Sequence, residues 1–220
     1  MFEEPSANIT QFLRDTLIND KVKFIKEFAV SDEEYNFKFE PTTTDLPEEI
    51  QYQCPILNVA IFYNAMNSFK HLVQGGSKLT GTDSWLCGPA HMAARCGRIK
   101  MLSHELLETI NFQAMDWRGR TPAHYAAEFD HLDCLRFLIE TKGCNPNARD
   151  KFGMTPLHLA CANGHIDIIE YLIQNNAEWT TDALNRSPLE VAVEKGQIEA
   201  LRFFASRNQS AIINSETVFF

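Results

Sequence analysis

The sequence lacks the patterns on which many enzymes, metal sites and membrane proteins depend. It contains no phosphate-binding loop of the Gly-x-x-x-x-Gly-Lys type, no Gly-x-Gly-x-x-Gly and no His-Glu-x-x-His. Its six cysteines are scattered without a Cys-x-x-Cys pair, and no run approaches the ~18 apolar residues of a membrane span. We therefore expect no cofactor, no metal, no small-molecule substrate and no contact with a membrane.

Positive charge is also scarce. The chain has 20 lysines and arginines against 29 acidic residues, a net charge of −9 at pH 7. Proteins that bind nucleic acid usually present a basic face, so this balance argues against direct nucleic-acid binding. The opening Met-Phe-Glu-Glu-Pro-Ser lacks the basic and then apolar pattern of a secretory signal, and scattered cysteines fit a reducing compartment. We expect an intracellular protein of the cytoplasm or nucleus.

What the sequence does contain is one short sequence motif, here called the phrase, that is repeated several times. Its clearest copy starts at Asp150 and reads Asp-Lys-Phe-Gly-Met-Thr-Pro-Leu-His-Leu-Ala-Cys. Related phrases start at Asp83, Asp116 and Asp182, and residues 53–60 form a weaker first copy. The anchoring prolines, at intervals of 34, 33, 34 and 32 residues, are Pro55, Pro89, Pro122, Pro156 and Pro188.

The local chemistry of the phrase predicts a turn followed by two short helices. Asp150 and Gly153 suit a tight turn in which the glycine takes positive φ. Thr155 before Pro156 indicates an N-cap followed by proline in the first helical turn, and Gly164 ends that helix. A second helix follows with an apolar face at Ile168, Ile169, Leu172 and Ile173. Each helix is too short to fold alone, so the unit needs neighbours.

This period, with Thr-Pro-Leu-His and Gly-His at matching offsets, closely resembles the ankyrin repeat. The resemblance implies an all-α ankyrin-repeat solenoid, built of helix-turn-helix repeats with β-turn or hairpin loops. We expect five repeats over 49–210, at about 49–82, 83–115, 116–149, 150–181 and 182–210. Residues 1–30 would form a divergent helical N-terminal cap or a separate partner-binding helix pair, 31–48 an acidic linker, and 211–220 an apolar C-terminal tail.

Several copies depart from the family's pattern. In the second copy Leu86 and Gly88 stand where the family has glycine and threonine, which puts that turn and helix cap in question. In the fifth copy Asn185 replaces the turn glycine, and asparagine is among the few other residues that tolerate the left-handed region. Ser187 there still offers a capping oxygen. In the first copy Asn58 replaces the histidine, as suits a terminal repeat that caps the stack.

Three histidines, His91, His124 and His158, occupy the same place in successive repeats. Equivalent positions in a solenoid lie about 10 Å apart, too far to share one ion at Zn–N distances of ~2.0–2.1 Å. The resemblance implies that they form hydrogen bonds between turns instead. Ankyrin repeats contain no catalytic machinery, and few residues lie outside them, so we predict that the chain is not an enzyme.

The turn tips and the adjoining helix ends carry the strongest functional signal. The resemblance implies that these positions line the concave face, where partners usually bind. Tryptophan and arginine often dominate binding energy, although some of these side chains could serve only as packing between turns. We predict a non-catalytic protein-binding module, a scaffold or adaptor, that recognises an acidic or phosphorylated segment of its partner. The candidate residues are Trp85, Arg95, Trp117, Arg118, Arg120, Phe129, Lys151, Phe152, Met154, Leu184 and Arg186.

Other functions would use the same face. A regulatory inhibitor and a proteasome-assembly chaperone are two alternatives. Residues 31–50 suggest autoinhibition, because seven acidic residues and Lys38 give them a net charge of −6, and Tyr35, Phe37 and Phe39 alternate among the charges. Such a segment could lie along a basic, apolar groove; a solvated linker is the simpler interpretation.

Overall fold

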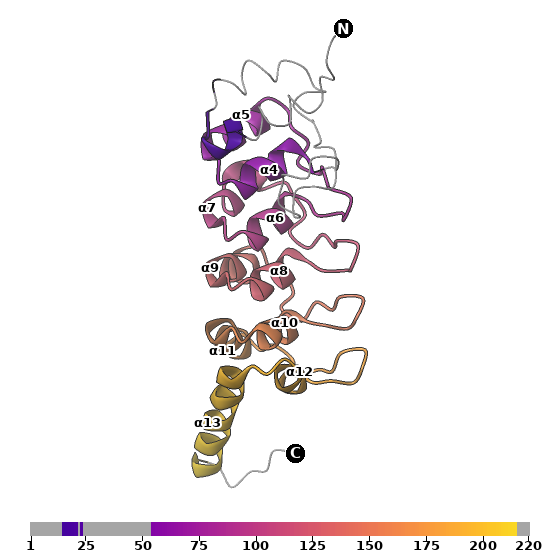
Figure 1. Ribbon diagram of the computed structural model, residues 1–220, viewed down its shortest axis with the longest axis vertical. Helices are drawn as coiled ribbons and strands as arrows, with labels where there is room; N and C mark the ends of the chain where they lie inside the picture. Colours follow the sequence, from indigo (N-terminus) through magenta and orange to yellow (C-terminus); the bar gives the residue numbers. More distant parts are fainter. Residues whose placement is uncertain (1–14, 22, 24–53, 215–220) are drawn as a thin grey trace.

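The computed structural model describes residues 15–21, 23 and 54–214, with side chains in the last helix described as far as Arg207. Most of the expected N-terminal cap, the acidic linker and residues 215–220 lie outside the described residues. Figure 1 shows a column of helix pairs, with the turn loops projecting from one side and the second helices on the other. Within the described ranges, no helix is long and apolar enough to cross a bilayer.

Each repeat contributes two helices, and the predicted all-α architecture is confirmed. The first helices are α4 (Ile56–Phe62), α6 (Pro89–Arg95), α8 (Pro122–Glu128), α10 (Pro156–Asn163) and α12 (Pro188–Glu194). The second helices are α5 (Met66–Gln74), α7 (Ile99–Leu102), α9 (Leu132–Arg136), α11 (Ile166–Gln174) and α13 (Ile198–Asn214). A 3-10 turn, η2 (Glu105–Leu107), follows α7, and a π-helical turn, η3 (Phe137–Thr141), continues α9. Helix α13 runs past residue 210, where we expected the last repeat to end.

The predicted helix signals operate as expected. Thr155 Oγ1 accepts a hydrogen bond from the His158 backbone N–H, and Ser187 Oγ accepts one from Glu190 N–H. Both caps satisfy backbone donors that a helix N-terminus leaves unpaired. Gly164 ends α10 in the left-handed conformation, with φ 75°. Alanines fill the contacts between first helices, and Ala93, Ala94, Ala126, Ala127 and Ala160 are fully buried.

Each of the four turn loops between residues 83 and 186 closes around a buried aspartate. The Asp150 backbone N–H donates to the Met154 carbonyl, and the Gly153 N–H donates to the Asp150 carbonyl, both at 2.9 Å. The inner carboxylate oxygen, Asp150 Oδ1, accepts the N–H groups of Phe152 and Met154 at 2.8 and 2.9 Å. The same bonds recur around Asp83, Asp116 and Asp182. Each loop is therefore a rigid hairpin that projects from the column.

Leu86 occupies the left-handed position that Gly119, Gly153 and Asn185 hold in the other loops. Its φ is 62°, and its side chain is about half exposed. The loop closes in the same way as the others, because Leu86 N–H donates to the Asp83 carbonyl at 3.1 Å. The departure from the family pattern therefore leaves the turn intact and places a branched residue where the backbone is strained.

Replacing Leu86 with glycine is expected to raise the free energy of unfolding by about 1 kcal/mol. The left-handed conformation costs roughly 1–2 kcal/mol for a residue with a Cβ, and the flexibility of glycine in the unfolded chain returns about 0.5–1 kcal/mol of this. Thermal unfolding followed by circular dichroism measures the change. Leu184→Gly is the matched control, since Leu184 is exposed in an equivalent loop without positive φ. Stabilisation by both substitutions, or by neither, would contradict the explanation.

The three equivalent histidines bridge neighbouring repeats, as expected. Nε2 of His91, His124 and His158 lies 3.1, 3.1 and 3.2 Å from the carbonyl oxygens of Arg120, Met154 and Arg186. A carbonyl only accepts, so each Nε2 carries the hydrogen. Their Nδ1 atoms accept backbone N–H groups at the start of their own helices. Each histidine thereby ties one helix start to the next turn loop.

The structure explains why the first and last repeats have no histidine at this position. Asn58, fully buried in the first repeat, donates Nδ2–H to the Cys87 carbonyl at 3.1 Å and so replaces the histidine bridge. Glu190, in the last repeat, accepts the Ser187 N–H at 2.7 Å and caps its own helix. In the described part of the chain no further turn loop follows that one, so a side chain that donates outward would have no acceptor there.

A second ladder of bonds ties each second helix to the preceding repeat, and sequence reasoning missed it. Nε2 of His131 and of His165 lies 3.0 and 2.9 Å from the carbonyl oxygens of Arg95 and Glu128. The equivalent residues Arg98 and Gln197 donate to the carbonyls of Phe62 and Ala162. These acceptors lie at the C-terminal ends of the first helices, where carbonyls lack helical partners. The two ladders hold the loops and helix ends in fixed register.

Part of the expected N-terminal cap contacts the first repeat. Leu17 is fully buried in the core. The Asp20 carboxylate accepts the backbone N–H groups of Asn67 and Ser68 at 3.0 and 2.8 Å, at the start of α5. A carboxylate at a helix N-terminus satisfies free donors and favours the helix dipole. These contacts support a capping role for this segment, whose boundaries stay a prediction.

Candidate functional site

Two adjacent pockets lie between the turn loops and the C-terminal ends of the first helices; we call them together the loop groove. The first lies between the second and third repeats, and the second pocket between the third and fifth. They share Arg120 and Glu128. The first pocket is lined by Asp83, Trp85, Cys87, His91, Met92, Arg95, Trp117, Arg118, Arg120, Tyr125, Glu128 and Phe129. The second is lined mainly by Phe152, Met154, Leu159, Ala162, Asn163, Leu184, Arg186, Val191 and Lys195.

The structure brings nearly all of the predicted binding residues into this groove. Trp85, Arg95, Trp117, Arg118, Arg120 and Phe129 line the first pocket. Arg120, Phe152, Met154, Leu184 and Arg186 line the second. Lys151 is exposed on its loop tip and lines neither pocket. The groove thus unites side chains from four successive loops.

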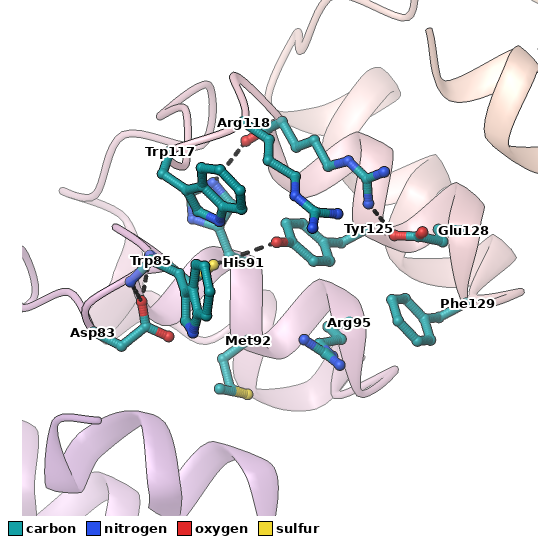
Figure 2. A pocket seen from close by; sticks show the side chains of 12 residues that line it. Asp83, Trp85, His91, Met92, Arg95, Trp117, Arg118, Tyr125, Glu128 and Phe129 are labelled. Carbon is teal, nitrogen blue, oxygen red and sulfur yellow. Dashed lines mark hydrogen bonds and ion pairs between the residues drawn. The ribbon is translucent and has the colours of Figure 1, made fainter. Parts of the chain in front are cut away.

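A pair of tryptophans forms one wall of the first pocket (Figure 2). Trp85 and Trp117 come from the tips of neighbouring loops, and their ring centroids are 5.1 Å apart at 39°. The Trp117 N–H donates to the Trp85 carbonyl at 3.0 Å, which fixes the two loops to each other. Each tryptophan is 39% exposed. They are therefore packed enough to be rigid and open enough to contact another molecule.

Two arginines lie over aromatic rings that face the same pocket. The Arg118 guanidinium carbon is 4.8 Å from the Trp117 ring centroid, and that of Arg95 is 4.9 Å from the Phe129 centroid. Phe129 in turn stacks on Tyr125 at 6.4 Å and 8°. Figure 2 shows the tryptophans on one side, Phe129 on the other and Tyr125 between them. Cation–π contacts of this kind hold long side chains in place.

Arg120 and Arg186 use their charge within the chain. Arg120 pairs with Glu128 at 2.6 Å and with Asp150 at 3.5 Å. Arg186 pairs with Asp182 at 2.7 Å and also with Glu194. We had expected Arg120, together with Arg118 and Lys151, to pair with an acidic partner. Its position between two carboxylates shows that it holds neighbouring repeats together.

Buried titratable groups at the base of the groove are held in their neutral forms. Burial raises the pKa of the Cys87 thiol to about 12, and Tyr125, whose pKa burial also raises, donates its hydroxyl to Asp116 Oδ2 at 2.7 Å. Burial lowers the pKa of His91 and brings that of His124 to about 4. A thiol in this state is a poor nucleophile. Among the described residues, no group of three or more His, Cys, Asp or Glu is placed to hold a metal ion.

Six residues of the first pocket were not among the predicted site residues: Asp83, Cys87, His91, Met92, Tyr125 and Glu128. Met92 and Tyr125 lie on the first helices of their repeats and are largely buried, and both line the groove. The signal for Tyr125 was present, because it stands where the clearest copy of the phrase has Leu159. A phenol at a core position needs a hydrogen-bond partner, and Asp116 supplies one.

The sequence model of the family described as ankyrin repeats (many copies) matches residues 123–173, which include α8 to α11. Ankyrin repeats generally mediate contacts between proteins and are typically not enzymes. The match covers the best copies of the phrase, and helix pairs and turn loops closed around an aspartate continue on both sides of it. Residues 123–173 thus match the ankyrin-repeat family, and the stacked helix pairs of the described chain are consistent with an all-α ankyrin solenoid.

Proposed function

We propose that the chain is a non-catalytic scaffold or adaptor that binds a partner protein through the loop groove. The observation that carries this proposal is the tryptophan pair, Trp85 and Trp117, which is partly exposed on loops that the backbone bonds and buried aspartates hold rigid. A preformed aromatic surface loses little conformational freedom on association. Large aromatic side chains also contribute most of the binding energy in many interfaces.

Exposed apolar side chains continue from the tryptophans along the groove. Phe152 is 58% exposed and Leu184 70% exposed, each at the tip of the next loop. These residues follow one another at the spacing of the repeats, so they form a row across the column of loops. A row of this kind suits an extended partner segment that runs along the stack and places a side chain against each loop.

The charges of the loop tips support an acidic or phosphorylated partner segment. Arg118 lies over the Trp117 ring, and Lys151 is on the adjacent tip, where its backbone N–H donates to the Arg118 carbonyl at 2.8 Å. Neither side chain forms an ion pair with the described residues, in contrast to Arg120. Positive charges at the rim of an interface steer and orient an acidic partner. The net charge of −9 favours a protein partner over nucleic acid.

We also infer an intracellular location, in the cytoplasm or the nucleus. None of the six cysteines forms a disulfide bond, and Cys54, Cys87, Cys134, Cys144 and Cys161 are buried within the repeats. Free thiols persist in reducing compartments. A role as a regulatory inhibitor or assembly chaperone would use the same groove. Residues 31–50, the proposed autoinhibitory segment, lie outside the described residues.

The experiment that tests this function compares the proteins captured by three forms of the chain. Trp117→Ala with Arg118→Ala removes the centre of the first pocket, and Trp179→Ala with Arg202→Ala is the matched control. Trp179 is 49% exposed but packs on Phe204, away from the groove. Loss of a central anchor typically costs 2 kcal/mol or more, so recovery should fall about tenfold or further.

Affinity purification with quantitative mass spectrometry provides the measurement. We expect a set of proteins that the wild type and the control capture equally and that the groove variant loses. Circular dichroism should show the same helix content for all three forms. Equal recovery of every captured protein by the folded groove variant would exclude the loop groove as the binding surface.

A further inference from the structure

The outer carboxylate oxygen of each turn aspartate distinguishes one loop from the other three. For Asp116, Oδ2 accepts the Tyr125 hydroxyl at 2.7 Å. For Asp182, Oδ2 accepts Arg186 Nη2 and Nε at 2.7 and 2.9 Å. For Asp150, Oδ2 lies 3.5 Å from Arg120 Nε, in an ion pair. In these three loops the chain itself supplies a partner, a hydrogen-bond donor for Asp116 and Asp182 and an ion-pair partner for Asp150.

Asp83 has no such donor among the described residues. Its Oδ1 accepts the N–H groups of Trp85 and Cys87 at 2.8 and 2.9 Å, and every hydrogen bond of its carboxylate goes to that oxygen. In Figure 2 both dashed lines to Asp83 end on one oxygen, and the other has none. Yet the residue is only 7% exposed. The outer oxygen is not fully buried, so a partner group that enters the pocket can donate to it and be stabilised there.

The sequence explains why this loop differs. The partner of the outer oxygen is the fourth residue after the aspartate for Asp182 (Arg186), the ninth for Asp116 (Tyr125), and a residue of the preceding loop for Asp150 (Arg120). The fourth residue after Asp83 is Cys87, a weak donor, and the ninth is Met92, which has no donor. The Cys87 thiol faces the Tyr125 hydroxyl at 3.4 Å instead.

Asp83 also lines the first pocket, beside Trp85, Met92 and Trp117. We propose that this end of the loop groove binds an arginine side chain of the partner protein, which donates to Asp83 Oδ2 and stacks on the tryptophan wall. The inference rests on the proposed function and assigns a basic residue to the partner segment. Its acidic or phosphorylated group then contacts Arg118 and Lys151, farther along the loop tips.

Arginine fits this position better than lysine. Its planar guanidinium donates in a fixed fork and stacks on aromatic rings, and it is more weakly hydrated than an ammonium group. The chain already uses the same pairing, since Arg118 lies over Trp117 and Arg186 pairs with Asp182. The charged groups that face Asp83 are Asp116, which favours a cation, and Arg95, which opposes one. The buried acid and the aromatic wall therefore have to act together.

The test measures binding of fluorescent hexapeptide mixtures to the full chain by fluorescence polarisation. Each mixture has one fixed central residue: arginine, lysine, citrulline, glutamate or phosphoserine. Citrulline keeps the shape of arginine without its charge. Loss of one partner of a buried charge pair weakens binding strongly, so we expect arginine mixtures to bind about tenfold tighter than citrulline mixtures.

Two variants isolate Asp83. Asp83→Asn keeps the Oδ1 acceptor and removes the charge, and Met92→Tyr places a hydroxyl where Tyr125 serves Asp116. Both should retain the melting temperature within a few degrees and lose the preference for arginine over citrulline. Asp133→Asn, on the exposed face of α9, is the control and should keep the preference for arginine over citrulline.

The outcomes separate this inference from the proposed function. An arginine preference that persists in folded Asp83→Asn would overturn the inference. So would binding of glutamate or phosphoserine mixtures without any preference for arginine; if Trp117→Ala with Arg118→Ala abolished that binding, the proposed function would stand alone. Failure of every mixture to bind the wild type would also overturn the inference, while the capture experiment would decide the proposed function independently.

Discussion

Replacing Gly153 with alanine is expected to lower the free energy of unfolding by roughly 2–5 kcal/mol. Gly153 has φ 72°, where a Cβ costs roughly 1–2 kcal/mol. A Cβ there would also lie 2.8 Å from the Ala183 backbone nitrogen and 3.1 Å from the Asp182 carbonyl carbon. These atoms belong to the backbone of the next loop, which cannot move alone, and overpacking of this kind typically costs about 1–3 kcal/mol more.

The effect should reach beyond the turn itself. Ala183 N–H donates to the Phe152 carbonyl at 2.8 Å, and this bond joins the turn loops of the fourth and fifth repeats. A Cβ on Gly153 would push these loops apart and open the second pocket. The loop contacts of the first pocket lie two repeats away and should be retained, so arginine selection by Asp83 should survive in the folded fraction.

Gly196→Ala provides the matched control. Gly196 has φ 67°, almost the same as Gly153, but a Cβ there meets nothing within 4 Å. The Gly196→Ala substitution should lower the free energy of unfolding only by the roughly 1–2 kcal/mol that the left-handed conformation costs a residue with a Cβ. Urea unfolding followed by circular dichroism gives both values. Equal losses for the two substitutions would show that the close approach of the loops contributes nothing to stability.

The sequence predicted the features whose causes are local. A proline after Thr155 or Ser187 starts a helix wherever it stands, because the cap and the fixed φ act within four residues. The repeat length then placed His91, His124 and His158 at equivalent points of the stack. The bridges they form follow from that equivalence, and the structure confirms them.

What the sequence did not predict depends on contacts across the stack. The charge of Arg120 is used by Glu128 and Asp150, and no local pattern shows that these carboxylates lie on the same side of the loop. The second ladder, with His131 and His165, joins residues 36 and 37 positions apart. The ladder position holds histidine in two repeats, arginine at Arg98 and glutamine at Gln197, and the sequence alone does not show which carbonyl these side chains reach.

The tryptophans combine a feature that the sequence predicts with one that depends on contacts between repeats. Their place at the loop tips followed from the repeat alone, and the structure shows that they pack between neighbouring loops and stay 39% exposed. Their contact at 5.1 Å, and the guanidinium over Trp117, required the geometry of two adjacent loops. Which surface binds a partner could be proposed from the sequence. The distribution of charge on that surface could not be predicted from the sequence, because ion pairs within the chain neutralise some of the charged side chains.

Lowering the pH from 7 to 5 is expected to reduce the stability of the folded stack by about 2 kcal/mol from His124 alone. Burial lowers the pKa of His124 from 6.5 to about 4 and outweighs the favourable effects of the Met154 carbonyl and Asp150. Between these two values the unfolded chain binds the proton and the folded chain does not. The stabilisation is therefore fully present above pH 6.5 and is lost as the pH falls towards 4.

Other groups modify this dependence. Burial also lowers the pKa of His91 and His158, which act in the same direction as His124. Burial raises the pKa of Asp83. Protonation of this carboxyl as the pH falls therefore favours the folded state, opposite to the effect of the histidines. His91, His124 and His158 act together to reduce stability as the pH falls.

His124→Asn tests the assignment, with Asn58 as its precedent in the same chain. Asn58 forms the equivalent bridge to the Cys87 carbonyl and does not titrate. The variant should be less stable than the wild type at pH 7, because it loses the bonds of Nδ1 to Thr121. Between pH 7 and 5 it should lose about 2 kcal/mol less than the wild type, as urea unfolding at each pH would measure. Parallel pH profiles for the two proteins would show that His124 is not the group responsible, since only the removal of a buried neutral imidazole changes the number of protons taken up on unfolding.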